Sequence, residues 1–140
     1  MEPPYRITVS LGIVTIPNRI KFFKNLINSI FAGSQLPDEI IIVINGIKDG
    51  NNSKLSSYIK LLNNIEHKTD RPIIKYICLT ENVPLGYCGA LLVKYSVCDY
   101  ISIVDDVLID RSWMEKIRCS LILRPDIVAG RVEPHPNTSI

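Results

Sequence analysis

Residues 39–46 read EIIIVING, five consecutive β-branched residues followed by Asn-Gly. A β-branched run of this length favours a strand, and Asn-Gly favours the turn that ends it. A strand that is apolar at every position, without alternation, buries both of its faces. This segment therefore predicts a strand inside a parallel sheet that is covered by helices on both sides.

Strand-like and helix-like segments alternate along the rest of the chain. The expected strands are residues 7–16, 39–45, 73–79, 100–104 and 127–132. Apolar residues at helical spacing follow at 20–31, at 55–62 with Ser53 as the helix cap, at 90–95, and from about Ser112 to a stop at Pro125. This alternation predicts an α/β fold, a three-layer α/β/α sandwich around a mostly parallel sheet.

The size and charge of the chain limit the possible classes of function. A length of 140 residues predicts a single domain, with a core over residues 7–133 and a loose tail over 134–140. The content of 46% hydrophobic and 21% charged residues is typical of a folded globular protein. The net charge of +2 and the even spread of basic residues predict no surface for nucleic acid.

No segment suggests a membrane span or an export signal. The longest apolar run, residues 40–44, is far shorter than the roughly 18 residues that a transmembrane helix requires. The first residues lack the basic start and long apolar middle of a signal peptide, so a cytoplasmic location is expected. The four cysteines are expected to be small, mostly buried thiols.

The turns after the strands are the expected ligand site, because ligands of such sheets bind beyond the carboxyl ends of the strands. Asp105 and Asp106 follow the fourth expected strand directly. Two adjacent carboxylates repel each other unless a cation or hydrogen-bond donors neutralise them, and Mg²⁺ or Mn²⁺ bound together with a phosphorylated ligand would do so. The alternative is that one acid caps the next helix and the other is solvated. Because no glycine-rich phosphate loop occurs, metal and side chains would have to hold any phosphate.

Several motifs, taken in order, resemble the nucleotide-sugar-binding half of the family 2, GT-A type glycosyltransferases. The motifs are residues 14–19 (VTIPNR), 39–46 (EIIIVING), Asp49-Gly50, Glu81-Asn82 with Gly86, 99–106 (DYISIVDD), 113–116 (WMEK) and 124–132 (RPDIVAGRV). The resemblance covers about residues 7–133 and implies a minimal, Rossmann-like GT-A fold.

The resemblance also implies roles for individual residues. Thr15 and Pro17 would face the nucleobase, Asn45 would hydrogen-bond its edge, Asp105 would bind ribose or metal, and Asp106 would hold the ion between the two phosphates. The full set implied for the nucleotide is Thr15, Pro17, Asn18, Arg19, Asn45, Asn82, Gly86 and Asp105. The implied reaction is inverting transfer from a UDP- or GDP-sugar to a hydroxyl acceptor, with Mg²⁺ or Mn²⁺ as cofactor.

Each of these side chains also has a structural explanation. Asn45 and Gly46 are ordinary turn residues, Asn18 can cap the first helix, Arg19 can be a solvated charge, and Trp113 is expected in the core. The sequence also departs from the family pattern, with Ile44 and Val107 where acids are common and Ile47 where serine is common.

The family's acceptor-binding half, which carries the general base, is expected to be missing from this chain. The nearest candidates for the base are Glu133 and His135, although a proline-flanked surface turn is the simpler explanation of both. The acceptor site would then come from a partner or from a second copy of the chain. The alternative function is a non-catalytic nucleotide-binding or protein-interaction module.

Overall fold

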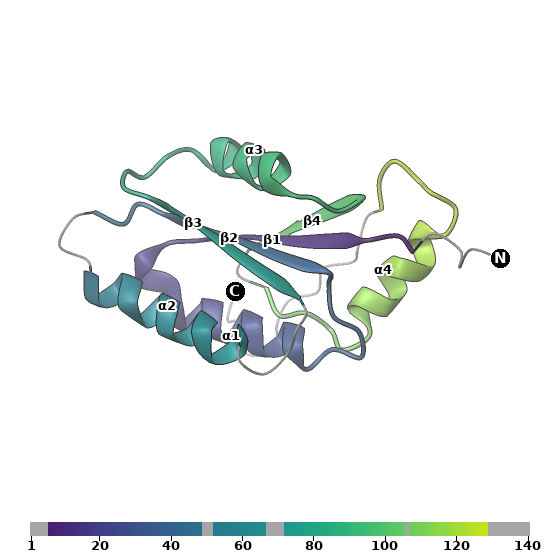
Figure 1. The fold of residues 1–140 in the computed structure, drawn as a ribbon, viewed down its shortest axis with the longest axis horizontal. Coiled ribbons are helices and arrows are strands. Elements are labelled where there is room, and N and C mark those ends of the chain that lie inside the picture. The colour runs from purple at the N-terminus through teal and green to yellow at the C-terminus, as the bar shows by residue number, and fades with distance from the viewer. Residues whose placement is uncertain (1–5, 49–51, 67–71, 106, 129–140) are drawn as a thin grey trace, which may run out of the picture.

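Among the residues that the structure describes, four parallel strands form one sheet (Figure 1). The computed structural model describes residues 6–48, 52–66, 72–105 and 107–128. The strands are β1 (Val9–Thr15), β2 (Glu39–Asn45), β3 (Ile73–Leu79) and β4 (Tyr100–Val104), in the order β3-β2-β1-β4. All three neighbouring pairs are parallel, so the carboxyl ends of the four strands lie along one edge of the sheet, here called the carboxyl edge.

Helices cover both faces of the sheet. They are the 3₁₀ turn η1 (Pro17–Arg19), α1 (Ile20–Phe31), α2 (Asn52–Glu66), α3 (Leu85–Tyr95) and α4 (Trp113–Leu121). In Figure 1, α1 and α2 lie below the sheet and α3 lies above it. The predicted α/β class with a parallel sheet between helical layers is therefore confirmed.

Several element boundaries differ from the sequence prediction, and α4 also ends at Leu121, before the predicted stop at Pro125. β1 is shorter at both ends than the predicted 7–16. α2 begins at Asn52, so Ser53 lies inside its first turn and is not the cap. α3 begins at Leu85, five residues before the predicted start. Residues 127 and 128 of the predicted fifth strand are not in a strand, and residues 129–132 lie outside the described part of the chain.

Burial of the strands follows their position in the sheet. β1 and β2 are central and buried along their whole length. β3 and β4 are the outermost strands of the sheet, and Ile73, Tyr76 and Ile103 on them are exposed. The expectation that every strand is apolar and buried on both faces is therefore correct for the two central strands only. Every residue of β3 and β4 keeps part of its surface exposed.

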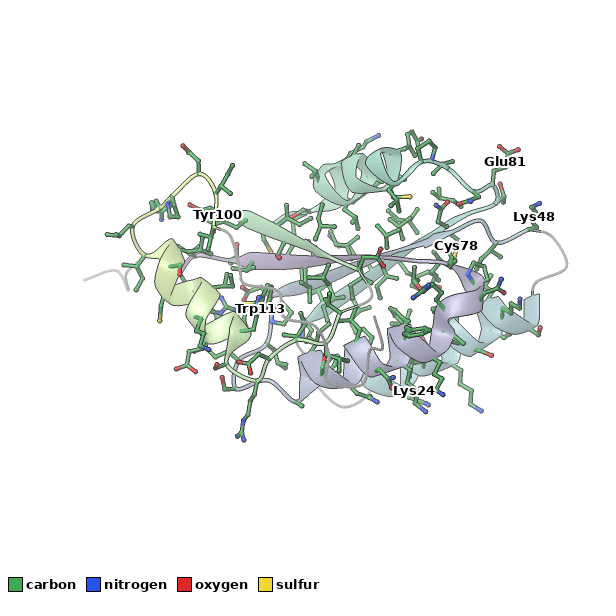
Figure 2. The ribbon with its side chains drawn as sticks, turned by 180° about the vertical axis from the view of Figure 1, so that it is seen from behind. Lys24, Lys48, Cys78, Glu81, Tyr100 and Trp113 are labelled. Atoms are coloured by element: carbon green, nitrogen blue, oxygen red, sulfur yellow. The ribbon has the colours of Figure 1, made fainter. Side chains whose placement is uncertain are left out.

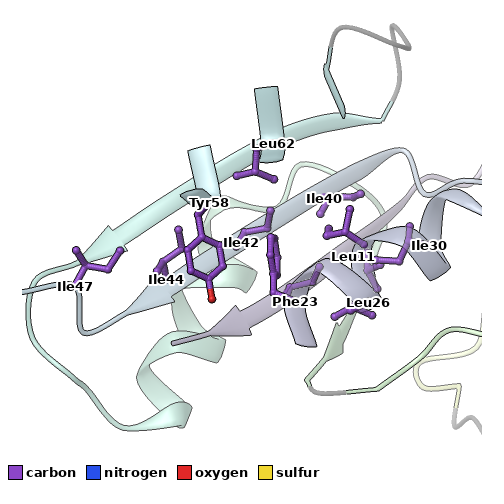
Figure 3. Close-up of a cluster of buried hydrophobic side chains, with 12 residues drawn as sticks. Leu11, Phe23, Leu26, Ile30, Ile40, Ile42, Ile44, Ile47, Tyr58 and Leu62 are labelled. Carbon is purple, nitrogen blue, oxygen red and sulfur yellow. The ribbon is translucent and has the colours of Figure 1, made fainter. Parts of the chain in front are cut away.

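The main core lies between the sheet and the layer formed by α1 and α2 (Figure 3). Its fully buried side chains come from β1, β2, α1 and α2, and include Leu11, Ile13, Phe23, Leu26, Ile27, Ile40, Ile42, Ile44, Tyr58 and Leu62. A smaller cluster joins the opposite face to α3 through Cys88 and Leu92. A Cβ at Gly12 would come within 3.0 Å of Leu92 Cδ1, so the glycine allows α3 to pack closely on β1.

A buried charge lies at the opposite, amino edge of the sheet, beneath the end of α3. Glu39 is 1% exposed; its Oε1 accepts a hydrogen bond of 2.7 Å from Ser10 Oγ, and its Oε2 lies 2.6 Å from Lys75 Nζ. The backbone N–H of Val97 donates to the same carboxylate. Burial raises the pKa of Glu39, but the contacts with Lys75, Ser10 and Val97 outweigh it, so the pKa is lowered below its ordinary value. Glu39 is therefore held ionised inside the fold.

The amino edge also anchors α4. The Asp38 carboxylate accepts hydrogen bonds from Val9 N–H and from Arg118 Nη1, at 2.9 and 3.1 Å. Arg118 Nη2 also donates to the Leu36 carbonyl at 2.7 Å. These charge-assisted contacts join α4 to the starts of β1 and β2 and leave the carboxyl edge on the far side of the sheet.

The cysteines are less buried than predicted. All four are free thiols; Cys88 is buried, whereas Cys78 and Cys119 are exposed. Cys78 lies on edge strand β3 and Cys119 on the outer helix α4, which explains their exposure. Within the described residues, no helix is both long and apolar enough to span a bilayer.

Candidate functional site

The strand register brings four turns together at the carboxyl edge, as predicted from the sequence. Thr15 pairs with Ile44, Asn45 pairs with Leu79, and Ile13 pairs with Val104. Residues that follow these strand ends therefore lie at the same edge of the sheet. In Figure 2, Lys48, Cys78 and Glu81 lie together at this edge, and Tyr100, the first residue of β4, lies at the other end.

Asn45, the last residue of β2, holds the loop that follows β3. Its Nδ2 donates to the Val83 carbonyl at 2.9 Å, and its Oδ1 accepts from the Val83 N–H at 3.0 Å. The side chain is 3% exposed. One primary amide thus satisfies both polar groups of one backbone residue, an arrangement that needs a donor and an acceptor on the same side chain. The Asn45 amide is thus engaged with the β3–α3 loop, and its contact with a nucleobase stays a prediction.

Gly46 brings the turn after β2 against the same loop. Its φ of +83° lies in the left-handed region that glycine adopts without strain. Its N–H and that of Ile47 both donate to the Leu79 carbonyl, at 3.0 and 2.8 Å. A Cβ on Gly46 would lie 3.2 Å from Asn82 Cβ, so the exposed Asn82 sits directly beside this turn.

Thr15, the last residue of β1, faces the core and not the solvent. It is 7% exposed, and its Oγ1 lies 3.0 Å from the hydroxyl oxygen of Tyr58. The Tyr58 hydroxyl donates its single hydrogen to the Ile16 carbonyl at 2.7 Å, so Thr15 is the donor in the first bond. The Thr15 side chain is therefore engaged with α2, and its place beside a nucleobase stays a prediction.

Pro17, Asn18 and Arg19 form the short turn between β1 and α1. The Asn18 side chain accepts a hydrogen bond from Lys54 of α2, and no side-chain cap bond occurs at the start of η1 or α1. The alternative in which Asn18 caps the first helix is therefore wrong. The Arg19 guanidinium lies 4.5 Å above the Phe22 ring, a cation–π contact that keeps it at the side of this turn.

Gly86 is the second residue of α3, and the start of this helix lies at the carboxyl edge. Nothing lies within 4 Å of the position that a Cβ on Gly86 would take. The first N–H groups of a helix lack partners within the helix, and they carry the positive end of its dipole. The amino end of α3 can therefore accept a phosphate, with open space in front of Gly86.

Asp105 is exposed and follows β4 directly. Asp106 lies outside the described residues, as do Glu133 and His135. Among the residues that the structure describes, no three histidine, cysteine, aspartate or glutamate side chains gather as a metal-binding group. Mg²⁺ and Mn²⁺ take one or two carboxylates and complete their shell with phosphate and water, so an exposed carboxylate such as that of Asp105 suits either ion. Asp105 is thus a suitable ligand for an ion that arrives with a diphosphate.

Two residues at this edge had no predicted role in the site, Tyr58 and Lys54 of α2. Tyr58 occupies an apolar position of its helix and looks like a core residue in the sequence. A buried tyrosine nevertheless needs a hydrogen-bond partner for its hydroxyl. This requirement was the sequence feature that could have indicated a role for Tyr58 at the site. Trp113 lies in the core as predicted, partly buried between two apolar clusters.

Comparisons with known proteins agree with this geometry. The sequence model of Glycosyl transferase family 2 matches residues 13–138. Among curated proteins, none matches the chain.

Solved structures of S. aureus TarS share the fold. The crystal structure of TarS 1–349 superposes with a TM-score of 0.67 at 18% identity, over 92% of this chain and 39% of that chain. The structure of TarS 1–349 in complex with UDP gives 0.62 at 19% identity, over 92% and 38% of the two chains. A further TarS structure gives 0.61 at 18% identity, over 91% and 23%. The chain thus spans less than two fifths of these proteins, and the family match shows that it belongs to glycosyltransferase family 2.

Proposed function

We propose that this chain binds a nucleoside-diphosphate sugar, UDP- or GDP-linked, at the carboxyl edge and serves in transfer of the sugar to a hydroxyl acceptor with inversion. The observation that carries the proposal is the convergence of Asp105, Asn82, Gly86 and the turn at residues 16–19 at one edge of a parallel sheet. Membership of glycosyltransferase family 2 and the structural likeness to TarS, which was crystallised with UDP, support it.

Different residues at the carboxyl edge would bind different parts of the ligand. The amino end of α3 would face the diphosphate, because its unpaired N–H groups favour an anion. Pro17, Asn18 and Asn82 would line the nucleoside, and Asp105, together with Asp106, would hold Mg²⁺ or Mn²⁺ against the phosphates. The bound cation would neutralise charge that develops on the departing nucleoside diphosphate.

Inversion requires that the acceptor oxygen attack the anomeric carbon from the side opposite to the leaving diphosphate, while a base removes its proton. Glu133 and His135 remain the candidates for that base within this sequence, and both lie outside the described residues. A partner or a second copy of the chain would otherwise supply base and acceptor site. Release of labelled sugar from a radiolabelled donor, with and without a hydroxyl acceptor, tests this step.

Replacing Asp105 or Asp106 by asparagine is expected to weaken nucleotide binding in the presence of Mn²⁺ by about tenfold, close to 1.4 kcal/mol. Asparagine keeps the size of the side chain but removes the negative charge that a hard cation requires. Isothermal titration calorimetry with UDP, GDP and their sugars, with Mn²⁺ or with EDTA, measures the effect. Asp110→Asn is the control, because Asp110 is an exposed acid of the same connection. Equal affinity with Mn²⁺ and with EDTA would contradict the metal site.

Gly86→Ala is expected to change stability and binding in opposite directions. Alanine favours the helix over glycine by roughly 0.5–1 kcal/mol, and the new Cβ meets no neighbour, so the melting temperature should rise. The same methyl group would occupy the space in front of the amino end of α3, so nucleotide affinity should fall several-fold. Gly89→Ala, with ordinary contact to Ile103 at 4.0 Å, should stabilise α3 without this loss. Unchanged affinity in Gly86→Ala would remove Gly86 from the site.

The second candidate function is a non-catalytic protein-interaction module, and the outer face of α3 favours it. Leu85, Tyr87 and Val93 of this helix are exposed at 64%, 55% and 58%. Exposed aromatic and aliphatic side chains of this size can contribute apolar contacts to a protein interface. Absence of heat with any nucleotide, together with wild-type folding, would favour this second function over the first.

A further inference from the structure

The hydroxyl of Tyr58 is a buried polar group that lies between α2 and the turn after β1. Tyr58 is 0% exposed, and its ring packs at 5.0 Å, centroid to centroid, from that of Phe23. Figure 3 shows the ring inside the cluster between sheet and helices, next to Ile44 and Phe23. A ring without a hydroxyl would fill this space in the apolar core equally well. The presence of a buried polar hydroxyl therefore needs a separate explanation.

The hydroxyl contacts the point where β1 ends and the turn begins. It accepts a hydrogen bond from Thr15 Oγ1 and donates one to the carbonyl of Ile16. The Ile16 carbonyl also accepts the Arg19 N–H at 3.0 Å, the bond that closes the turn at residues 16–19. Tyr58 therefore fixes the carbonyl on which the geometry of this turn depends.

A second contact from the same face of α2 reaches the same turn. Lys54 lies four residues before Tyr58, so the two side chains project from one side of the helix. Its ammonium donates to Asn18 in the middle of the turn. Two neighbouring side chains of α2 thus hold the turn that carries Pro17, Asn18 and Arg19.

We infer that Tyr58 is a positioning residue that holds the β1–α1 turn in the shape required for nucleotide binding. This inference rests on the proposed function, in which that turn lines the nucleoside. Tyr58 itself does not contact the ligand, since it is fully buried. Its hydroxyl acts through Ile16 and Thr15, so that the turn is already ordered when the nucleotide arrives and less ordering entropy is lost on binding.

Tyr58→Phe tests the inference, because it deletes the hydroxyl and keeps the ring. Its dissociation constant for UDP or GDP, whichever the wild type binds, is expected to rise three- to tenfold. Hydrogen exchange at the Arg19 amide should accelerate by a similar factor without ligand. Ser10→Ala is the matched control, because it deletes another fully buried hydroxyl with two hydrogen bonds, at the opposite end of β1. It should leave both readouts at their wild-type values.

The outcomes separate this inference from the proposed function. If the wild type binds nucleotide and Tyr58→Phe binds it equally well, the positioning role is wrong and the proposed function stands. If Ser10→Ala weakens binding as much as Tyr58→Phe, the effect is general loss of stability, and the role is again wrong. If the wild type binds no nucleotide, the proposed function fails and the role fails with it, even where Arg19 exchange accelerates.

Discussion

Replacing Lys75 by methionine is expected to destabilise the fold by about 2–3 kcal/mol at neutral pH. The substitution removes the ammonium that lies 2.6 Å from Glu39 Oε2 and leaves a carboxylate that is 1% exposed. Breaking a fully buried ion pair costs about 3–5 kcal/mol, and the cost is smaller here because the Lys75 side chain is 38% exposed. Chemical denaturation at pH 7 measures the loss.

The pH dependence of this effect identifies its cause. In the wild type the pKa of Glu39 is lowered, so its contribution is complete above about pH 4.5 and is lost as the pH falls through the folded-state pKa. Without Lys75, burial dominates and the pKa of Glu39 should rise above its ordinary value. The cost of burying the unpaired Glu39 charge should then disappear as acid protonates the carboxyl group. The difference between the two proteins should therefore shrink from pH 7 to pH 4.

The matched control is Lys116→Met. Lys116 pairs with Asp110 at 3.7 Å, and both side chains are largely exposed, so its loss should change stability far less than the loss of Lys75. If both lysine variants lost the same stability, or if the loss in Lys75→Met did not vary with pH, the buried charge would not be the cause.

Asn45→Leu is expected to destabilise the fold by about 2 kcal/mol and to weaken nucleotide binding at least several-fold. Leucine fills a similar volume but leaves the N–H and carbonyl of Val83 without their partners, at roughly 1 kcal/mol or more for each lost bond. Because Val83 is only half-buried, water can replace part of the loss. The loop that carries Asn82 and leads to Gly86 would lose its attachment to β2, which explains the expected loss of affinity.

Asn28→Leu is a suitable control for this prediction, since Asn28 is exposed on α1. It should change neither the melting temperature nor the calorimetric affinity appreciably. A several-fold loss of affinity in Asn45→Leu with unchanged hydrogen exchange at Val83 would indicate direct contact between Asn45 and the nucleotide. That result would overturn the loop-holding role described here.

The sheet was largely predictable, because β2, β3 and β4 are β-branched or aromatic runs bounded by turn residues. The start of α3 was not, since Pro84 and Gly86 resemble turn residues although Pro84 occupies the position before the first helical residue. Pro84 fixes its own φ without requiring an N–H partner, which suits a helix start. The sequence therefore predicted the presence of this helix better than its length.

The orientation of side chains at the site was harder to predict. β1 is buried at all seven positions, so its sequence does not reveal which face each residue occupies or that Thr15 contacts Tyr58. The role of Asn45 depends on where the β3–α3 loop passes, 38 residues later in the chain. Such contacts depend on tertiary packing between distant segments, which local sequence patterns do not record.

The pairing of Asn45 with Val83 also limits how this sequence can evolve. Aspartate at position 45 could still accept the Val83 N–H, but its other carboxylate oxygen would face the Val83 carbonyl, where Asn45 Nδ2 now donates. Two oxygen acceptors at that distance repel each other. Asn45→Asp is therefore expected to weaken the attachment of the loop unless a second substitution removes the repulsion.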